Sequence, residues 1–163
     1  MSFKIFISYS TRDLAQVELL RQQLQATPIE IFVAEHSVAP SQELAPTIAN
    51  AIGTCDLFVL LWSSNAKESE WVSQEIGRAS ALGKPILPLV LSEGIALPGF
   101  IQGLKYLPIH SDPDGSLAAA RTLILNEYHR KQQFLASQAK EKQDKDALAL
   151  MGIGAFLLWV FSK

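Results

Sequence analysis

The sequence has little of several features that mark whole classes of protein. Its single cysteine, Cys55, excludes an internal disulfide, and we expect an inert core thiol in a protein of a reducing compartment. The three histidines lie far apart along the chain and have no metal-ligand spacing. The net charge of −2 gives no electrostatic basis for binding nucleic acid. We therefore expect no metal and no nucleic-acid partner.

Motifs of common nucleotide-binding and hydrolytic folds are also missing. No G-x-G-x-x-G follows the first predicted strand, and there is neither a Walker loop nor a G-x-S-x-G elbow. Where response regulators carry an acidic pair and a phospho-acceptor aspartate, this chain has residues 8–10 and 62–64, which hold no carboxylate. These absences argue against a Rossmann dinucleotide site, a hydrolase triad and a phosphoryl receiver.

Apolar runs alternate with amphipathic segments along the first three quarters of the chain. The expected strands are residues 4–9, 29–33, 57–62, 86–91 and 104–109. Helices are expected between them, with Asp13 capping the first and residues 116–130 forming the last. This alternation predicts an α/β fold, a five-stranded parallel sheet with helices on both faces. Both common doubly wound strand orders are open, and we choose the flavodoxin-like order 2-1-3-4-5 for a chain of five strands.

The stretch from Cys55 to Glu75 is the centre of the prediction. An unbroken apolar run at 57–62 is typical of a strand buried on both faces, and a helix at 70–82 follows a polar turn. Trp71 and Glu75 stand four residues apart and share one face of that helix. Two interpretations stay open: a small-molecule site, or a packed tryptophan beside a solvated glutamate.

The strand order favours the first interpretation. Winding reverses between the first and third strands, and ligands of open α/β sheets bind at such a crevice. Residues 8–11 and 63–65 would then flank the crevice, with Glu75 on its rim and Trp71 as a wall. We take Ser8, Tyr9, Ser63 and Trp71 as candidate substrate-binding residues beside the Glu75 carboxylate.

The remainder of the chain is a tail. Residues 131–146 are polar and form either a linker or a helix extension, and residues 147–163 are a hydrophobic C-terminal segment. As a helix, the uncharged run 147–161 would span about 22 Å, against a hydrocarbon core of about 30 Å. We expect it to contact or anchor to a membrane, with residues 1–130 kept in the cytoplasm by the lysines and arginines between 130 and 145. The alternative is packing against a partner chain or the domain itself.

Three segments resemble those of Toll/interleukin-1 receptor (TIR) domains, of the bacterial and archaeal type. FISYSTRD at 6–13 is similar to their opening box, and residues 31–52 resemble their second strand, BB loop and following helix. Residues 55–76 resemble their third strand and W-x-x-x-E helix. The resemblance covers residues 2–130 and implies the same five-stranded parallel sheet that the periodicity predicts independently.

Two functions follow from the resemblance. Many TIR domains cleave NAD at the nicotinamide–ribose bond in defence or cell-death responses, and their essential glutamate corresponds to Glu75. NAD would be the substrate, with no cofactor. Other members are non-catalytic adaptors, which here would be a scaffold tethered at a membrane. A nucleoside 2-deoxyribosyltransferase-like enzyme would use the same glutamate chemistry.

Self-association with other TIR domains is implied in either case. The interface is expected in the BB loop, at Val38, Ala39, Pro40, Ser41 and Gln42. Two residues depart from the family pattern there: Ala34 replaces the usual acidic residue after the second strand, and Ser41 replaces the usual glycine after Pro40. These departures predict altered substrate contacts and altered self-association.

Overall fold

The computed structural model describes the backbone of residues 2–33 and 44–161, and side chains within these ranges as far as residue 147. It divides into two compact units, Met1–Leu125 and Asn126–Lys163. The predicted self-association residues Val38, Ala39, Pro40, Ser41 and Gln42 lie outside the described residues.

The first unit is built on a five-stranded sheet. Its strands are β1 (Phe3–Ser8), β2 (Ile29–Val33), β3 (Leu57–Trp62), β4 (Ile86–Val90) and β5 (Leu107–Pro108). Their order is β2-β1-β3-β4-β5, and every neighbouring pair is parallel. The predicted fold class and strand order are therefore confirmed. The carboxyl ends of all strands meet at one edge, and β1 and β3 are neighbours there.

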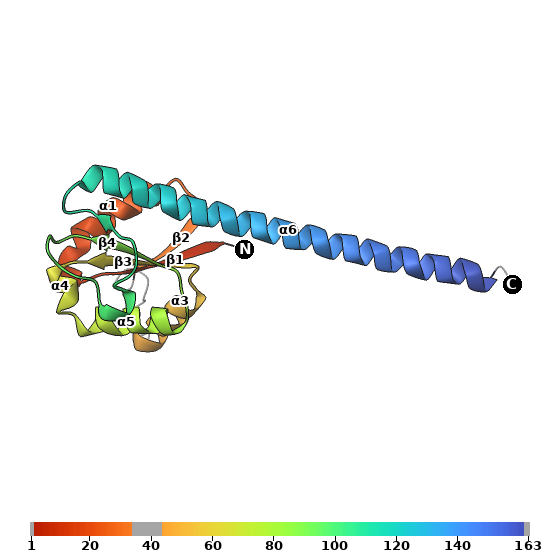
Figure 1. The fold of residues 1–163 in the computed structure, drawn as a ribbon, viewed down its shortest axis with the longest axis horizontal. Coiled ribbons are helices and arrows are strands. Elements are labelled where there is room, and N and C mark those ends of the chain that lie inside the picture. The colour runs from red at the N-terminus through yellow and green to blue at the C-terminus, as the bar shows by residue number, and fades with distance from the viewer. Residues whose placement is uncertain (1, 34–43, 162–163) are drawn as a thin grey trace. The chain divides into compact units, whose positions relative to one another are not determined.

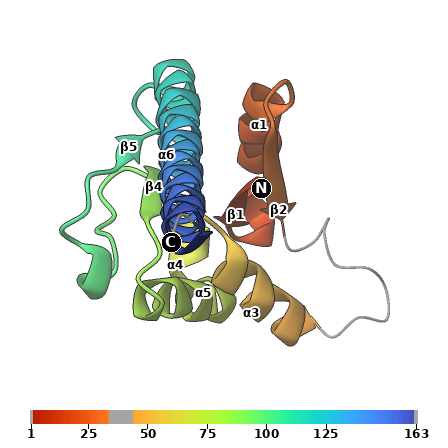
Figure 2. The ribbon, with the colours of Figure 1, turned by 90° about the vertical axis from the view of Figure 1, so that its right-hand side faces the viewer.

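Helices cover both faces of this sheet. Figures 1 and 2 show α1 (Leu14–Leu24) and the first turns of α6 (Pro113–Phe161) on one face. The other face is covered by α3 (Leu44–Thr54) and α5 (Glu70–Ala81), which contact each other and both contact β1. A short helix, α4 (Ser64–Lys67), follows β3 directly.

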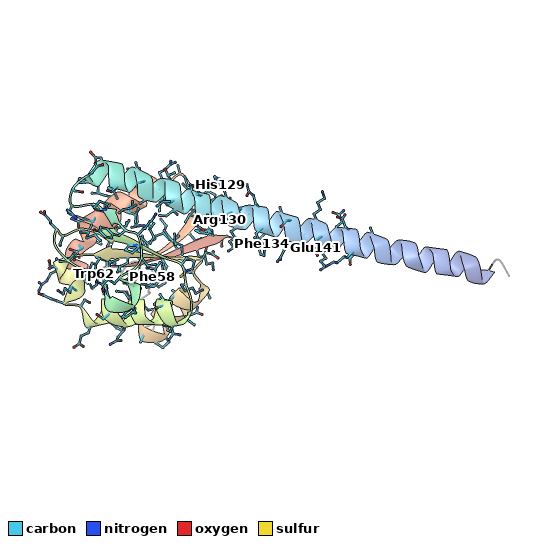
Figure 3. All side chains as sticks on the ribbon, in the orientation of Figure 1. Phe58, Trp62, His129, Arg130, Phe134 and Glu141 are labelled. Atoms are coloured by element: carbon cyan, nitrogen blue, oxygen red, sulfur yellow. The ribbon has the colours of Figure 1, made fainter. Side chains whose placement is uncertain are left out.

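The core between the sheet and the α3–α5 layer is apolar and aromatic. Phe6 of β1 is fully buried and stacks on Phe32 and Phe58, with ring centroids 5.4 Å apart in both pairs. Ile52 and Ile76 close on these rings from the two helices, and Figure 3 shows Phe58 and Trp62 within this body of the protein. Burying each such side chain stabilises the fold by about 1.5–3 kcal/mol, so α3 and α5 are held firmly over one set of strands.

The helices and strands depart from those expected from the sequence mainly at three places. The predicted strand 104–109 is only the two-residue β5, at the edge of the sheet, where Pro108 has no N–H to donate. The polar turn after β3 is the helix α4, capped by Ser63, whose Oγ accepts the backbone N–H of Ala66 at 2.9 Å. The last helix begins at Pro113 and continues well past residue 130.

The second unit consists of the later part of α6. Its backbone is helical as far as Phe161, and residues 131–146 belong to this helix. Ion pairs join Glu127 to Arg130 at 3.1 Å and Glu141 to Lys145 at 2.6 Å, each worth a few tenths of a kcal/mol. Figure 3 shows Phe134, which is 59 % exposed, and Glu141 along this helix.

None of the helices in the described part of the chain has the length and apolar character needed to cross a membrane. Membrane contact by residues 147–163 stays a prediction from the sequence.

A buried aspartate joins the ends of β1 and β3. Asp13 was predicted to cap α1, but its side chain makes no capping hydrogen bond and is only 6 % exposed. Its carboxylate accepts hydrogen bonds from Ser63 Oγ at 2.5 Å and Asn65 Nδ2 at 2.9 Å. The capping prediction is wrong because Ser63 and Asn65, at the start of α4, lie close enough to supply two better-placed donors. Asp13 thus fixes the turn after β3 relative to the segment after β1.

Asp13→Ala is expected to lower the free energy of unfolding by about 2–4 kcal/mol, because the buried Ser63 hydroxyl and the half-buried Asn65 amide lose their carboxylate acceptor. Ser63→Ala is expected to cost less, since Asn65 keeps its bond to Asp13. Urea denaturation of both single variants and the double variant should give a coupling energy of about 1–2 kcal/mol. Strictly additive effects would show that this contact stabilises nothing.

Candidate functional site

Glu75 lies on α5 with its carboxylate turned toward the end of β1. The helix starts at Glu70 and is capped by Ser69, whose Oγ accepts the backbone N–H of Val72 at 3.3 Å. The Glu75 side chain is only 7 % exposed, and its Oε2 accepts a hydrogen bond from Ser8 Oγ at 2.5 Å. Within the described residues it has no cationic partner.

This burial changes the acid–base behaviour of Glu75. Desolvation raises its pKa from 4.5 to about 7, and the hydrogen bond donated by Ser8 acts in the opposite direction. A carboxyl group with such a pKa is partly protonated and partly ionised near neutral pH. It is therefore able to give or take a proton there, or to stabilise a developing positive charge.

A cavity of about 290 Å³ opens beside this carboxylate. Its lining residues come from the segment after β1, from α3 and from the start of α5: Tyr9, Ser10, Thr11, Leu44, Ile48, Ser69, Trp71 and Glu75. Four of them carry hydroxyl groups, which suit a sugar. Trp71 is 45 % exposed and offers an aromatic surface one helical turn from Glu75.

A second cavity of about 380 Å³ lies between α3 and α5. It shares Ile48, Trp71 and Glu75 with the first, so the two cavities adjoin and have part of their walls in common. Gln74 and Arg78 complete its α5 wall. Both cavities lie toward the face of the sheet covered by α3 and α5.

The structure brings only some of the predicted site residues together. Glu75, Tyr9 and Trp71 line one cavity. Ser8 is 1 % exposed and lines neither cavity. Its hydroxyl donates a hydrogen bond to Glu75 from the end of β1. Ser63 also lies outside both cavities, and its hydroxyl is engaged by Asp13 and by the N–H of Ala66. Among the predicted residues, Tyr9, Trp71 and Glu75 thus line a cavity, and Ser8 and Ser63 lie outside it.

Sequence reasoning missed Arg78. A signal for Arg78 was present, because residues 71, 75 and 78 follow the i, i+4, i+7 spacing of one helix face. Ser10 and Thr11 lie in the segment 8–11 that was expected to flank the crevice, and both line the first cavity.

Comparison with known proteins identifies the family to which this fold belongs. The model of the TIR domain family matches residues 5–124. This chain belongs to the TIR domain family. The TIR domain of the Toll-related receptor TRR-2 from Hydra magnipapillata is 21% identical, with a TM-score of 0.64 over 76% of this chain and 97% of that one. No curated protein matches the sequence significantly.

Two further solved structures share the fold of this TIR domain. The CMP N-glycosidase BcmB of Clostridium botulinum is 21% identical, with a TM-score of 0.54 over 72% of this chain and 98% of that one. The TIR domains in the activated Roq1 resistosome are 17% identical, with a TM-score of 0.52 over 77% of this chain and 84% of that one. At such low identity these likenesses establish the fold alone.

Ser8→Ala is expected to raise the pKa of Glu75 above about 7, by roughly one unit, because the hydrogen bond that favours the carboxylate is lost. An NMR titration of the glutamate side-chain carboxyl carbons measures this shift in the TIR domain. Ser10→Ala is the matched control, since Ser10 lies two residues after Ser8, is also buried, and is not the donor to Glu75. An unchanged pKa in Ser8→Ala would remove Ser8 from the site.

Proposed function

We propose that this TIR domain cleaves NAD at the nicotinamide–ribose bond, with Glu75 as the catalytic residue. The observation that carries the proposal is a carboxylate with 7 % exposure, no cationic partner among the described residues, and a position in the walls of two adjoining cavities. Burying such a group costs stability, which is typical of a functional site.

The chemistry of the substrate suits a single carboxylate. In NAD the nicotinamide ring is a pyridinium, so the bond breaks with its electron pair returning to the ring nitrogen and neutral nicotinamide leaving. No acid is needed to protonate the leaving group. The ribose becomes oxocarbenium-like, and the Glu75 carboxylate stabilises that positive charge. Water then adds to the sugar and releases a proton, which gives ADP-ribose.

The lining of the first cavity supports the same proposal. The hydroxyls of Tyr9, Ser10, Thr11 and Ser69 offer hydrogen bonds to ribose, and the exposed face of Trp71 offers a surface for a flat ring. The CMP N-glycosidase BcmB, named for cleavage of an N-glycosidic bond, has the same fold. That likeness supports the reaction class, and the residues around Glu75 support its location.

Glu75→Gln is expected to lower the rate of NAD cleavage by roughly two to four orders of magnitude, because the amide carries no charge to oppose the growing cation. Product analysis of concentrated protein incubated with NAD measures this. The rate of the wild-type protein should rise with pH through about 7, since the carboxylate is the active form.

Glu70→Gln on the same helix is the control, because Glu70 is exposed and lines neither cavity.

The folded protein holds the Glu75 proton more tightly than the unfolded chain, so stability falls as pH rises from about 4.5 through about 7. Glu75→Gln should therefore be at least as stable as wild type above pH 7. Wild-type protein that never consumes NAD, even when assembled, would favour the adaptor function.

We also propose that activity accompanies self-association through Val38, Ala39, Pro40, Ser41 and Gln42. The TIR domains of the Roq1 resistosome are seen in an activated assembly, which supports this. Sedimentation velocity over a wide concentration range should reveal a weak, concentration-dependent oligomer. Ser41→Arg should shift it toward monomer by placing a charge in the interface, whereas Ser137→Arg on the exposed surface of α6 should not. A strict monomer at high concentration would contradict the proposal.

A further inference from the structure

The second cavity beside Glu75 has a cationic side chain in its wall. Its α5 residues are Trp71, Gln74, Glu75 and Arg78, which form one stripe along the helix. Arg78 is the one cation among the described residues that line either cavity. The cavity in which NAD would be cleaved thus shares part of its wall with one that carries positive charge.

The guanidinium of Arg78 is anchored and still has donors to spare. Its side chain is exposed, and its Nε donates to the backbone carbonyl oxygen of Ala49 at 3.2 Å, which links α5 to α3. No partner of Nη1 or Nη2 is found within the described part of the chain. An arginine held in this way loses little further freedom when its terminal nitrogens bind an anion.

The charge of Arg78 is also not used by Glu75, although the two residues are one helical turn apart. They form no ion pair, and the pKa of Glu75 is set by burial and by Ser8. The positive charge therefore remains available to a ligand that occupies the cavity.

We infer that Arg78 binds the diphosphate of the dinucleotide whose nicotinamide–ribose bond lies at Glu75. This rests on the proposed function, which places the ribose beside Glu75, a residue that the walls of both cavities share. The diphosphate is attached to that same ribose, and side chains one helical turn apart are about 5–6 Å from each other at Cβ, a spacing that suits neighbouring groups of one ligand. Guanidinium nitrogens also bind phosphate oxygens in pairs, with stronger hydrogen bonds than neutral donors make.

Two substrates with the same scissile bond test the inference. NAD carries the diphosphate, and nicotinamide riboside carries no phosphate. Arg78→Gln is expected to reduce kcat/KM for NAD by roughly 10- to 100-fold, mainly through KM, and to leave kcat/KM for the riboside unchanged. Arg78→Lys should restore part of the loss, because it keeps the charge but not the paired donors.

Arg121→Gln is a matched control for the structural role of Arg78. Arg121 also donates its Nε to a backbone carbonyl, that of Gln23 at 2.9 Å, and lies outside both cavities. It should leave the kinetics with both substrates unchanged. Equal losses with NAD and riboside in Arg78→Gln would show that Arg78 only holds α3 to α5, and would overturn the inference.

Binding measurements separate this inference from the proposed function. Calorimetric titration of NAD into Glu75→Gln protein, with and without Arg78→Gln, reports the phosphate contact without turnover. If wild-type protein does not cleave NAD but binds it through Arg78, the proposed function fails and the phosphate site stands. If wild-type protein cleaves NAD and Arg78→Gln binds and cleaves it equally well, the inference fails and the function stands. Absence of any NAD binding overturns both.

Discussion

The burial of the Glu75 carboxylate, with no cationic partner among the residues that the structure describes, is the constraint on which the site depends. Val72, Ile76 and Ala79 form the apolar stripe of α5, and they are almost fully buried against the sheet. Glu75 adjoins this stripe, so the same packing that fixes the helix also carries the carboxylate out of water. The hydrophobic contribution of its neighbours offsets the desolvation cost, and a pKa near 7 is the result.

Two sets of polar contacts lie at the carboxyl ends of β1 and β3, and they have different roles. Ser8, at the last position of β1, supports Glu75, while Asp13 a few residues later binds Ser63 and Asn65 beyond β3. The contact from Ser8 lowers the pKa of the Glu75 carboxyl group. The contacts of Asp13 hold the segments after β1 and β3 together. Ser63 belongs to the supporting set, although its place at the strand end had suggested a contact with substrate.

Helix α5 combines structural and functional faces along a single short element. Its buried positions hold it to the sheet, and the adjoining stripe supplies an aromatic ring, a carboxylate and a guanidinium to two adjoining cavities. Leaving Trp71 45 % exposed forgoes part of the stabilisation that burying a tryptophan would provide. Such an exposed ring beside a buried carboxylate supports the proposed ligand site.

The sequence by itself determined the architecture and the identity of the central carboxylate. Periodicity predicted β1 to β4 nearly to the residue, because it depends on neighbours within a few residues. The tertiary structure decided between the two common strand orders. It also decided which groups contact Glu75 and which line the cavities beside it. Ser8 and Glu75 are 67 residues apart, and Asp13 and Ser63 are 50 apart. No local pattern encodes such contacts, because they exist only once hydrophobic burial has brought the strand ends together.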